Sequence, residues 1–213
     1  MATYCVTFRL AGSLPAETIE RLKRERVHAL RRIGAIKQSQ RRVQEYRYYQ
    51  ASSFERFDEL LDASVVGPQW LRDGLIATAV ADAVRLFLAH PNELLCYCIM
   101  PNHVHLICKP YDSEDRASSS TNTERPEGHP PDFRLTQILS RVKGATARQA
   151  NLILHRRGAF WQHESYDRVI RDAAELERTV WYVLNNPVKA RLVDEWEEWP
   201  WTYCNPNLLH MER

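Results

Sequence analysis

Residues 94–109 read LLCYCIMPNHVHLICK, and this stretch predicts a β-hairpin. Its first part, residues 94–100, is an almost continuous apolar run with the length of a strand. A Pro-Asn pair then makes a tight connection. In residues 103–109 the polarity alternates, so every second side chain lies on the same face of the strand. The face that carries Val104 and Leu106 is therefore expected to pack in the core of the protein.

The rest of the sequence predicts helices around a small sheet. β-branched and aromatic residues indicate one further strand at 3–9, and residues 158–161 indicate a short strand or turn. Apolar residues at helical spacing predict helices at about 13–33, 40–62, 70–88, 134–154 and 172–187. This order predicts an α+β fold, in which helices cover one face of a small antiparallel sheet.

The chain has 213 residues, which is a suitable length for one domain. We expect a single domain over residues 1–213, with a helical insertion at about 13–65. Residues 111–131 contain almost no side chains that form a core. They predict a mobile loop or a linker.

The formal net charge is only +2, which gives no indication of a nucleic-acid partner. The charge is unevenly spread, however. Residues 21–47 hold ten Lys or Arg and two Glu, and residues 133–163 hold six Lys or Arg and no acidic residue. The remainder of the chain therefore carries a charge of −12. Each basic segment is either a solvated helix face or a surface that follows phosphate groups.

Several classes of protein are excluded by missing motifs. The sequence contains neither the GxGxxG motif of dinucleotide-binding folds nor the GxxxxGK[ST] motif of P-loop NTPases. Its five cysteines include no CxxC pair, which argues against a disulfide framework and against a cysteine zinc site. We also find no signal-peptide pattern and no apolar run long enough to span a membrane. We expect a cytoplasmic protein with no membrane partner.

Two histidines on the predicted hairpin are candidate metal ligands. His103 and His105 are two residues apart on a strand, so their imidazoles point to the same face, opposite Val104. This spacing allows both rings to bind one divalent metal ion. Taken alone, however, such a pair is more often two histidines that face solvent on a half-buried strand.

A second candidate pair lies on the last predicted helix. Tyr182 and Asn186 are four residues apart and therefore adjacent on the helix surface, away from its apolar stripe. Asn186 precedes Pro187, which favours the end of the helix there. Taken alone, Tyr182 is a surface or rim tyrosine.

Read together, these segments resemble a known family. Residues 98–107 resemble the MPNHVH signature of the HUH endonuclease superfamily. Residues 160–168 and 182–190 resemble the C-terminal signature of one branch, the REP-associated tyrosine transposases, which are relatives of the single-tyrosine insertion-sequence transposases. The resemblance covers most of residues 1–204. Two departures are Arg191, which stands where glycine is expected, and a basic segment at 21–47 that is longer than in compact members.

The resemblance implies a fold and a site. The fold would be a ferredoxin-like sheet with the histidines at its centre and the tyrosine helix against it. His103 and His105 would bind Mg²⁺ or Mn²⁺, with Asn186 as the third, polar ligand. Tyr182 would be the nucleophile that attacks a DNA phosphate and forms a 5′-phosphotyrosine intermediate, leaving a free 3′-OH.

The implied substrate is single-stranded DNA, presented as a hairpin with a flanking strand. The chain would act on it as a monomer or a homodimer. The cations expected to contact its phosphates are Arg141, Lys143, Arg148, Arg156 and Arg157. Tyr46, Tyr48 and Tyr49 could stack on bases or could simply pack against the protein.

Three functions are compatible with the sequence. The first is metal-dependent nicking and joining of DNA through Tyr182. The second is a domesticated, catalytically silent protein that binds a DNA hairpin. The third is an unrelated metal-dependent phosphodiesterase that uses water and does not require the tyrosine.

Overall fold

The computed structural model describes residues 2–64, 66–90, 93–110 and 133–208. The predicted loop at 111–131 lies outside the described residues. The strands are β1 (Thr3–Arg9), β2 (Leu94–Ile99), β3 (His103–Cys108), β4 (Tyr166–Ile170) and β5 (Thr202–Cys204). The α-helices are α1 (Ala16–Gly34), α2 (Ser39–Asp62), α3 (Gly74–Phe87), α4 (Phe133–Ile153), α5 (Ala173–Leu184) and the short α6 (Asn186–Lys189). In the described part of the chain, 3₁₀ turns lie at Trp70–Arg72, Trp196–Glu198 and Pro206–Leu208.

The strands form one antiparallel sheet in the order β4-β1-β3-β2-β5. The first four positions of this order, with helices between β1 and β2 and between β3 and β4, are those of a ferredoxin-like sheet. The predicted α+β, ferredoxin-like fold is therefore confirmed. β3 occupies the middle of the sheet, so its side chains are shielded by strands on both sides.

Helices cover both faces of this sheet, whereas the sequence analysis predicted helices on one face. Val6, Val104 and Leu106 belong to a core cluster that also includes residues of α3 and α4. Cys5 and Ile107 belong to a second cluster, together with residues of α2 and α5. Every residue of β2 and β3 is buried, which is the pattern of strands covered on both faces.

Residues 158–161, predicted as a short strand or a turn, form no strand of the sheet and make only an isolated bridge between Leu10 and Trp161. The strand at this edge of the sheet is β4, which lies later in the chain and pairs with β1. The sequence of β4, YDRVI, contains charged residues and its side chains are only partly buried, so it lacks the apolar pattern that predicts a strand. The tryptophan-rich C-terminal segment contributes β5 at the opposite edge.

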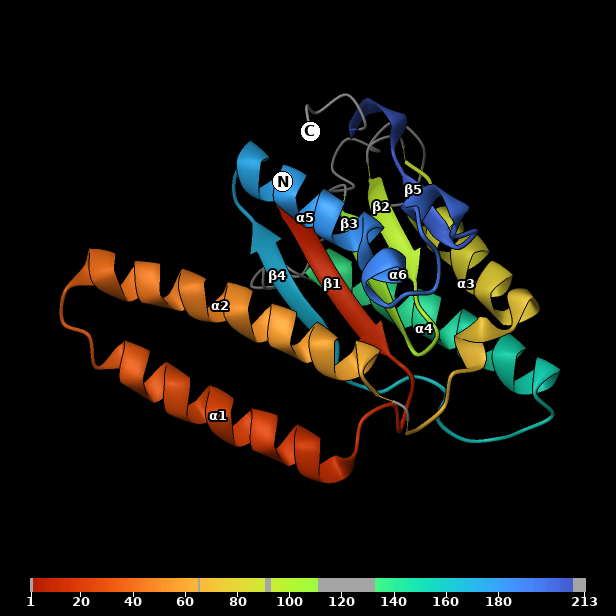
Figure 1. Ribbon diagram of the computed structural model, residues 1–213, viewed down its shortest axis with the longest axis horizontal. Coiled ribbons are helices and arrows are strands. Elements are labelled where there is room, and N and C mark those ends of the chain that lie inside the picture. Colours follow the sequence, from red (N-terminus) through yellow and green to blue (C-terminus); the bar gives the residue numbers. More distant parts are fainter. Residues whose placement is uncertain (1, 65, 91–92, 111–132, 209–213) are drawn as a thin grey trace, which may run out of the picture.

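α1 and α2 lie in the chain between β1 and α3 and form a long helical hairpin that extends away from the sheet (Figure 1). The buried residues of α2 are Phe54, Asp58 and Leu61, all in its C-terminal half. That half of α2 packs on the sheet face opposite α3 and α4. No helix in the described part of the chain is both long and apolar enough to cross a membrane.

Candidate active site

The two histidines of β3 lie side by side in the interior of the protein. Both side chains are completely buried, and their Nε2 atoms are 2.8 Å apart. Their rings meet edge to face, with centroids 4.6 Å apart. The predicted common orientation of His103 and His105 is confirmed, and the alternative that they face solvent is wrong.

Neighbouring polar groups fix the orientation of both rings. Asn102 donates through Nδ2 to the carbonyl of Leu61, so its Oδ1 faces Nδ1 of His103 at 2.6 Å and accepts a hydrogen bond from it. This bond leaves the lone pair of His103 on Nε2. Thr7 on β1 places its hydroxyl 2.9 Å from Nδ1 of His105, and a hydroxyl can either donate or accept there.

Burial keeps both imidazoles neutral. It lowers the pKa of His103 to about 3, because the charged ring would lose its hydration. Burial also lowers the pKa of His105, and the neighbouring His103 lowers it further. A neutral imidazole with a free nitrogen lone pair is the form that binds a metal ion.

Tyr182 reaches the histidines through a carboxylate that the sequence analysis did not identify. The Tyr182 hydroxyl donates to Oδ2 of Asp58 at 3.0 Å, and the same oxygen lies 3.7 Å from Nδ1 of His105. The Tyr182 and His105 ring centroids are 6.4 Å apart. α5 and the inserted helix α2 therefore bring a phenol and a carboxylate to the histidine pair.

The electrostatic environment keeps the Tyr182 proton in place. Burial raises the pKa of Tyr182 above its usual value, and the neighbouring Asp58 raises it further. The pKa of Asp58 is also raised, chiefly because its carboxyl is buried. At neutral pH Tyr182 is thus a protonated hydrogen-bond donor, with an acceptor already in contact with it.

A second carboxyl lies one turn further along α2. Oδ1 of Asp62 is 4.0 Å from Nε2 of His103, and burial raises the pKa of Asp62 to about 6. Asp58 and Asp62 are four residues apart and share one face of α2, next to the buried Phe54 and Leu61. In the sequence, two aspartates four residues apart within an apolar stripe were the signal that could have identified these residues.

Asn186 begins α6, directly after the helix that carries Tyr182. It is completely buried, and its Nδ2 donates to the Tyr182 carbonyl at 3.0 Å. Among the described residues, its Oδ1 has no hydrogen-bond partner and it makes no hydrogen bond to either histidine. The structure therefore places an unpartnered amide oxygen beside the backbone of Tyr182.

These donors fit a divalent cation by their chemistry. The site offers two neutral imidazole nitrogens, and the buried oxygens without a hydrogen-bond partner in the described chain include Oδ1 of Asp58, Asp62 and Asn186. Mg²⁺ prefers oxygen ligands, and Mn²⁺ accepts both oxygen and imidazole. In the described residues no three His, Cys, Asp or Glu side chains form a complete metal site.

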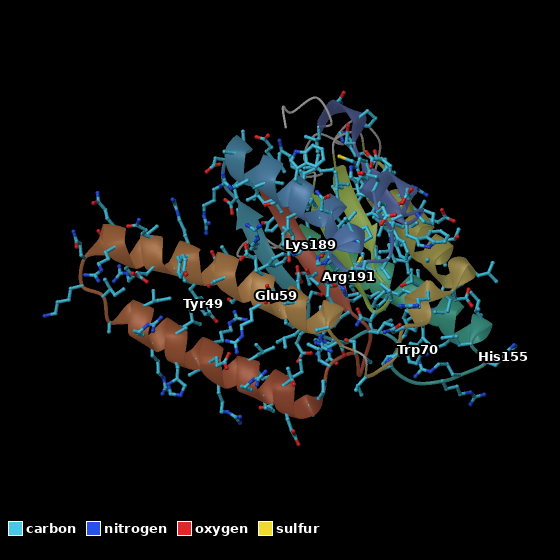
Figure 2. The ribbon with its side chains drawn as sticks, viewed as in Figure 1. Tyr49, Glu59, Trp70, His155, Lys189 and Arg191 are labelled. Atoms are coloured by element: carbon cyan, nitrogen blue, oxygen red, sulfur yellow. The ribbon has the colours of Figure 1, made fainter. Side chains whose placement is uncertain are left out.

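Tyr182 also borders a surface pocket of about 360 Å³ between α2, β4 and α5. Four arginines line this pocket: Arg47, Arg168, Arg171 and Arg178. Arg168 bonds to Glu175 at 2.6 Å and to Thr179 at 2.9 Å, so it is fixed within the protein. The ammonium of Lys189 on α6, labelled in Figure 2, lies 4.4 Å from the centre of the Tyr182 ring. The pocket is also lined by Glu55, Asp172 and Glu175, so the nucleophile candidate borders a surface of mixed charge.

The five cations predicted to contact DNA have different surroundings. Arg141, Arg148 and Arg157 are exposed. Lys143 instead donates to the carbonyls of Gln162 and His163, each at 3.0 Å, and to Ser165 at 2.8 Å.

Arg156 stacks over the Trp70 ring at 4.2 Å and bonds to Asn151 at 2.9 Å. Its partners, like those of Lys143, lie within the protein. Arg141, Lys143 and Arg148 belong to α4, which packs on the sheet face opposite the histidines. The structure therefore does not bring these three cations together with the histidine and tyrosine site.

Comparison with known proteins supports the family resemblance. The chain is 25% identical over 114 residues to a protein of Haemophilus influenzae named "Putative REP-associated tyrosine transposase". The resemblance to the REP-associated tyrosine transposases is confirmed. The alignment covers 53% of this chain and 59% of that relative, so this chain spans less than two thirds of the relative's length. No family model matches.

One solved structure, "Structure of the REP associates tyrosine transposase bound to a REP hairpin", aligns with 94% of this chain and 75% of that chain. Its TM-score is 0.44 and its sequence identity to this chain is 16%.

Arg191, which replaces a glycine expected in REP-associated tyrosine transposases, has the backbone conformation of a glycine. Its φ angle is 56°, in the left-handed region. The amides of Arg191 and Leu192 bond to the carbonyls of Val188 and Pro187, each at 2.9 Å. This is a Schellman motif that ends α6, and glycine favours it because it has no Cβ. Arg191 thus occupies a turn whose backbone conformation favours glycine.

Proposed function

We propose that this protein is a metal-dependent transposase or endonuclease that nicks and joins single-stranded DNA through Tyr182. The observation that carries the proposal is the contact of Tyr182 with Asp58, which in turn contacts the buried histidine pair. A phenol, a proton acceptor and two metal-binding nitrogens thus share one site. The family resemblance supports hairpin-type repeat DNA as the substrate.

Tyr182 needs help to attack phosphorus, because its hydroxyl remains protonated at neutral pH. As its oxygen bonds to the phosphorus, the hydroxyl proton passes to Oδ2 of Asp58, which already accepts a hydrogen bond from it. The bond from phosphorus to the 3′ oxygen breaks, and that oxygen takes up a proton from solvent and leaves as a 3′-OH. The DNA 5′-phosphate remains on Tyr182, so religation can reverse the step.

His103, His105 and Asn186 would hold Mg²⁺ or Mn²⁺. When bound, the metal ion supplies positive charge that polarises the scissile phosphate and fixes its position. Thr7 and Asn102 orient the imidazoles, and the fold excludes water from them because both rings are buried.

The test is a covalent trapping experiment. A labelled DNA hairpin with a single-stranded flank is incubated with the protein and Mn²⁺ and then separated on a denaturing gel. We expect an adduct with the wild-type protein and none with Tyr182→Phe. Phenylalanine retains the ring contacts with Phe54 and Lys189, so the variant should still fold.

The possible outcomes separate the candidate functions. Hairpin binding without cleavage by the wild-type protein would indicate the catalytically silent DNA-binding alternative. Cleavage that survives Tyr182→Phe would contradict the proposal and indicate attack by water. We also expect His103→Ala to abolish cleavage more completely than it weakens DNA binding.

A further inference from the structure

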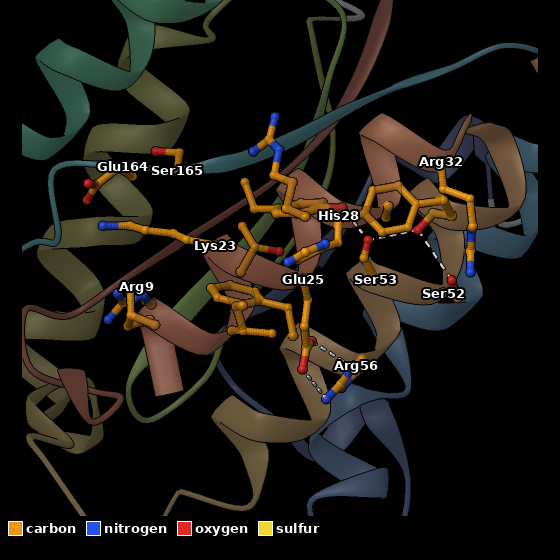
Figure 3. Close-up of a pocket in the computed structure, with 18 residues that line it drawn as sticks. Arg9, Lys23, Glu25, His28, Arg32, Ser52, Ser53, Arg56, Glu164 and Ser165 are labelled. Carbon is orange, nitrogen blue, oxygen red and sulfur yellow. Dashed lines mark hydrogen bonds and ion pairs between the residues drawn. The ribbon is translucent and has the colours of Figure 1, made fainter. Parts of the chain in front are cut away.

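A large groove lies between the α1–α2 hairpin and the sheet edge, away from the Tyr182 pocket. Its volume is about 1100 Å³, and it is lined by α1, α2, the end of β1 and residues 164–166 (Figure 3). On α1, Ile19, Leu22 and Ala29 face the groove. Much of the apolar stripe of α1 therefore borders open space, since Ile33 is the only buried residue of this helix.

The groove is rimmed by an excess of positive charge. Arg9, Lys23, Arg26, Arg32 and Arg56 line it, against two acidic residues, Glu25 and Glu164.

Glu25 is engaged by Arg56 at 2.8 Å, as the dashed lines in Figure 3 show. Arg26 and Arg32 have neither a hydrogen bond nor an ion pair to any described residue. Both side chains are exposed, so their guanidinium groups are available to an anionic ligand.

Aromatic rings lie among these cations. Tyr49, Phe57 and Tyr166 all border the groove. The Phe57 and Tyr166 rings are stacked, with centroids 5.8 Å apart and planes inclined by 20°. A positively charged groove with aromatic side chains is the combination that binds single-stranded nucleic acid, because cations follow the phosphates and rings stack on bases.

The groove and the candidate active site meet at Thr7 of β1, a buried residue that borders both. Thr7 lines the groove, and its hydroxyl is 2.9 Å from Nδ1 of His105. On α2, Ser53 and Phe57 face the groove, whereas Phe54 and Asp58 face the histidine side. Thr7 therefore stands between a ligand in the groove and His105, a candidate metal ligand.

We infer that this groove binds a single strand of DNA that flanks the hairpin and leads it toward the histidine site. The inference rests on the proposed DNA-processing function for its choice of ligand, and on the charge and aromatic lining for its location. A neutral partner would leave Arg26 and Arg32 without counter-charges. A phosphate backbone supplies counter-charges along the length of the groove.

The test compares two charge-reversed variants. Arg26→Glu/Arg32→Glu changes the groove, and Arg24→Glu/Arg31→Glu is the matched control, because Arg24 and Arg31 are exposed on the same helix but do not line the groove. Binding of a fluorescent single-stranded oligonucleotide, and of a blunt hairpin without a flank, is followed by anisotropy at several salt concentrations. Thermal unfolding verifies that both variants are folded.

We expect the groove variant to bind the single strand about tenfold or more weakly and with a reduced salt dependence. The control should lose much less affinity, and neither variant should change binding of the blunt hairpin by a comparable factor. Arg26→Gln/Arg32→Gln should show a smaller loss in the same direction.

Equal losses in the groove variant and the control would overturn the inference, since they would reflect bulk charge alone. So would a change in sedimentation mass of the groove variant with unchanged DNA affinity, which would identify a second copy of the chain as the occupant. The Tyr182-dependent adduct is measured separately. Its absence would contradict the proposed function, whereas its retention with unaltered strand binding would contradict only the groove.

Discussion

Asp58 contacts both parts of the candidate site, the phenol of Tyr182 and the imidazole of His105. The proposed role of Asp58 as proton acceptor can therefore be tested separately from that of Tyr182 as nucleophile. Asparagine has nearly the same shape but is a much weaker proton acceptor. We expect Asp58→Asn to slow formation of the covalent adduct about 100-fold, within the range for loss of a general base.

The measurement is the single-turnover rate of adduct formation, with hairpin affinity determined in parallel. Glu59→Gln is the control, because Glu59 is the exposed neighbour on the same helix (Figure 2). A rate for Asp58→Asn equal to that of the control would show that the carboxylate is not the proton acceptor.

Arg191 adopts a left-handed conformation that costs an L-residue about 1–2 kcal/mol. Glycine removes this cost but adds flexibility to the unfolded chain. We expect Arg191→Gly to increase the free energy of unfolding by about 1 kcal/mol, measured by urea denaturation. Arg191→Ala should give no such increase, because alanine has a Cβ. Equal effects of both substitutions would contradict the conformational explanation.

The buried histidines make stability depend on acid. The pKa of His103 is about 3 when folded, against 6.5 for an ordinary histidine, so as the pH falls below 6.5 the unfolded chain binds protons that the folded chain does not. Stability that is present above pH 6.5 is then lost toward pH 3. Asp62 acts in the opposite sense, because its raised pKa of about 6 contributes stability at low pH that is lost as the pH rises.

His103→Gln isolates the histidine contribution, since Asp62 is present in both proteins. Between pH 7 and pH 5, without added divalent metal, we expect the wild-type protein to lose about 1–2 kcal/mol more stability than the variant. Parallel pH profiles in urea denaturation would contradict this assignment.

At the level of elements, Lys143 joins α4 to the segment that leads into β4. Its ammonium donates to two carbonyls and one hydroxyl, and burial lowers its pKa to about 8. Lys143→Ala leaves these acceptors without their donor, so we expect a loss of about 1–3 kcal/mol in the free energy of unfolding. Arg141→Ala, an exposed change on the same helix, should have almost no effect on stability. If Lys143→Ala weakened DNA binding without affecting stability, Lys143 would be a phosphate contact as the sequence predicted.

The elements that the sequence predicted best are those with a strong local period. The alternation in residues 103–109 predicted both β3 and the common direction of its histidines, because side chains on a strand alternate regardless of what surrounds them. β4 was missed because its Asp167 and Arg168 break the apolar pattern. β5 has only three residues, too few to show a period.

Asp58 and Asp62 could not be placed at the site from the sequence. Their i, i+4 spacing shows that they share a helix face, but the sequence does not show which part of the sheet that face contacts. Their proximity to the histidines depends on the packing of an inserted hairpin against a central strand. Tyr182 and Asn186 were identified only through the family signature, because a tyrosine beside an apolar stripe is ordinary by itself.

At the scale of the whole molecule, the α1–α2 hairpin has two parts with different packing. Residues 39–53 of α2 include no buried side chain, whereas its C-terminal half contains Phe54, Asp58 and Leu61. Few buried contacts mean a low free energy of local opening. We expect amide hydrogens of residues 39–53 to exchange at least about tenfold faster than those of 54–62, as measured by mass spectrometry. Uniform protection along α2 would contradict this description of the hairpin.

α2 has one face on the groove and the other on the histidine site, and this has a thermodynamic consequence. Under the two proposals, a DNA strand in the groove and a metal ion at His103 and His105 would both bind to the same helix. Each ligand that restrains α2 would reduce the conformational entropy that the other must remove. Linkage would then be reciprocal: the factor by which the metal ion tightens strand binding equals the factor by which the strand tightens metal binding. The inserted helix would thus act as an allosteric coupler as well as a wall of the site.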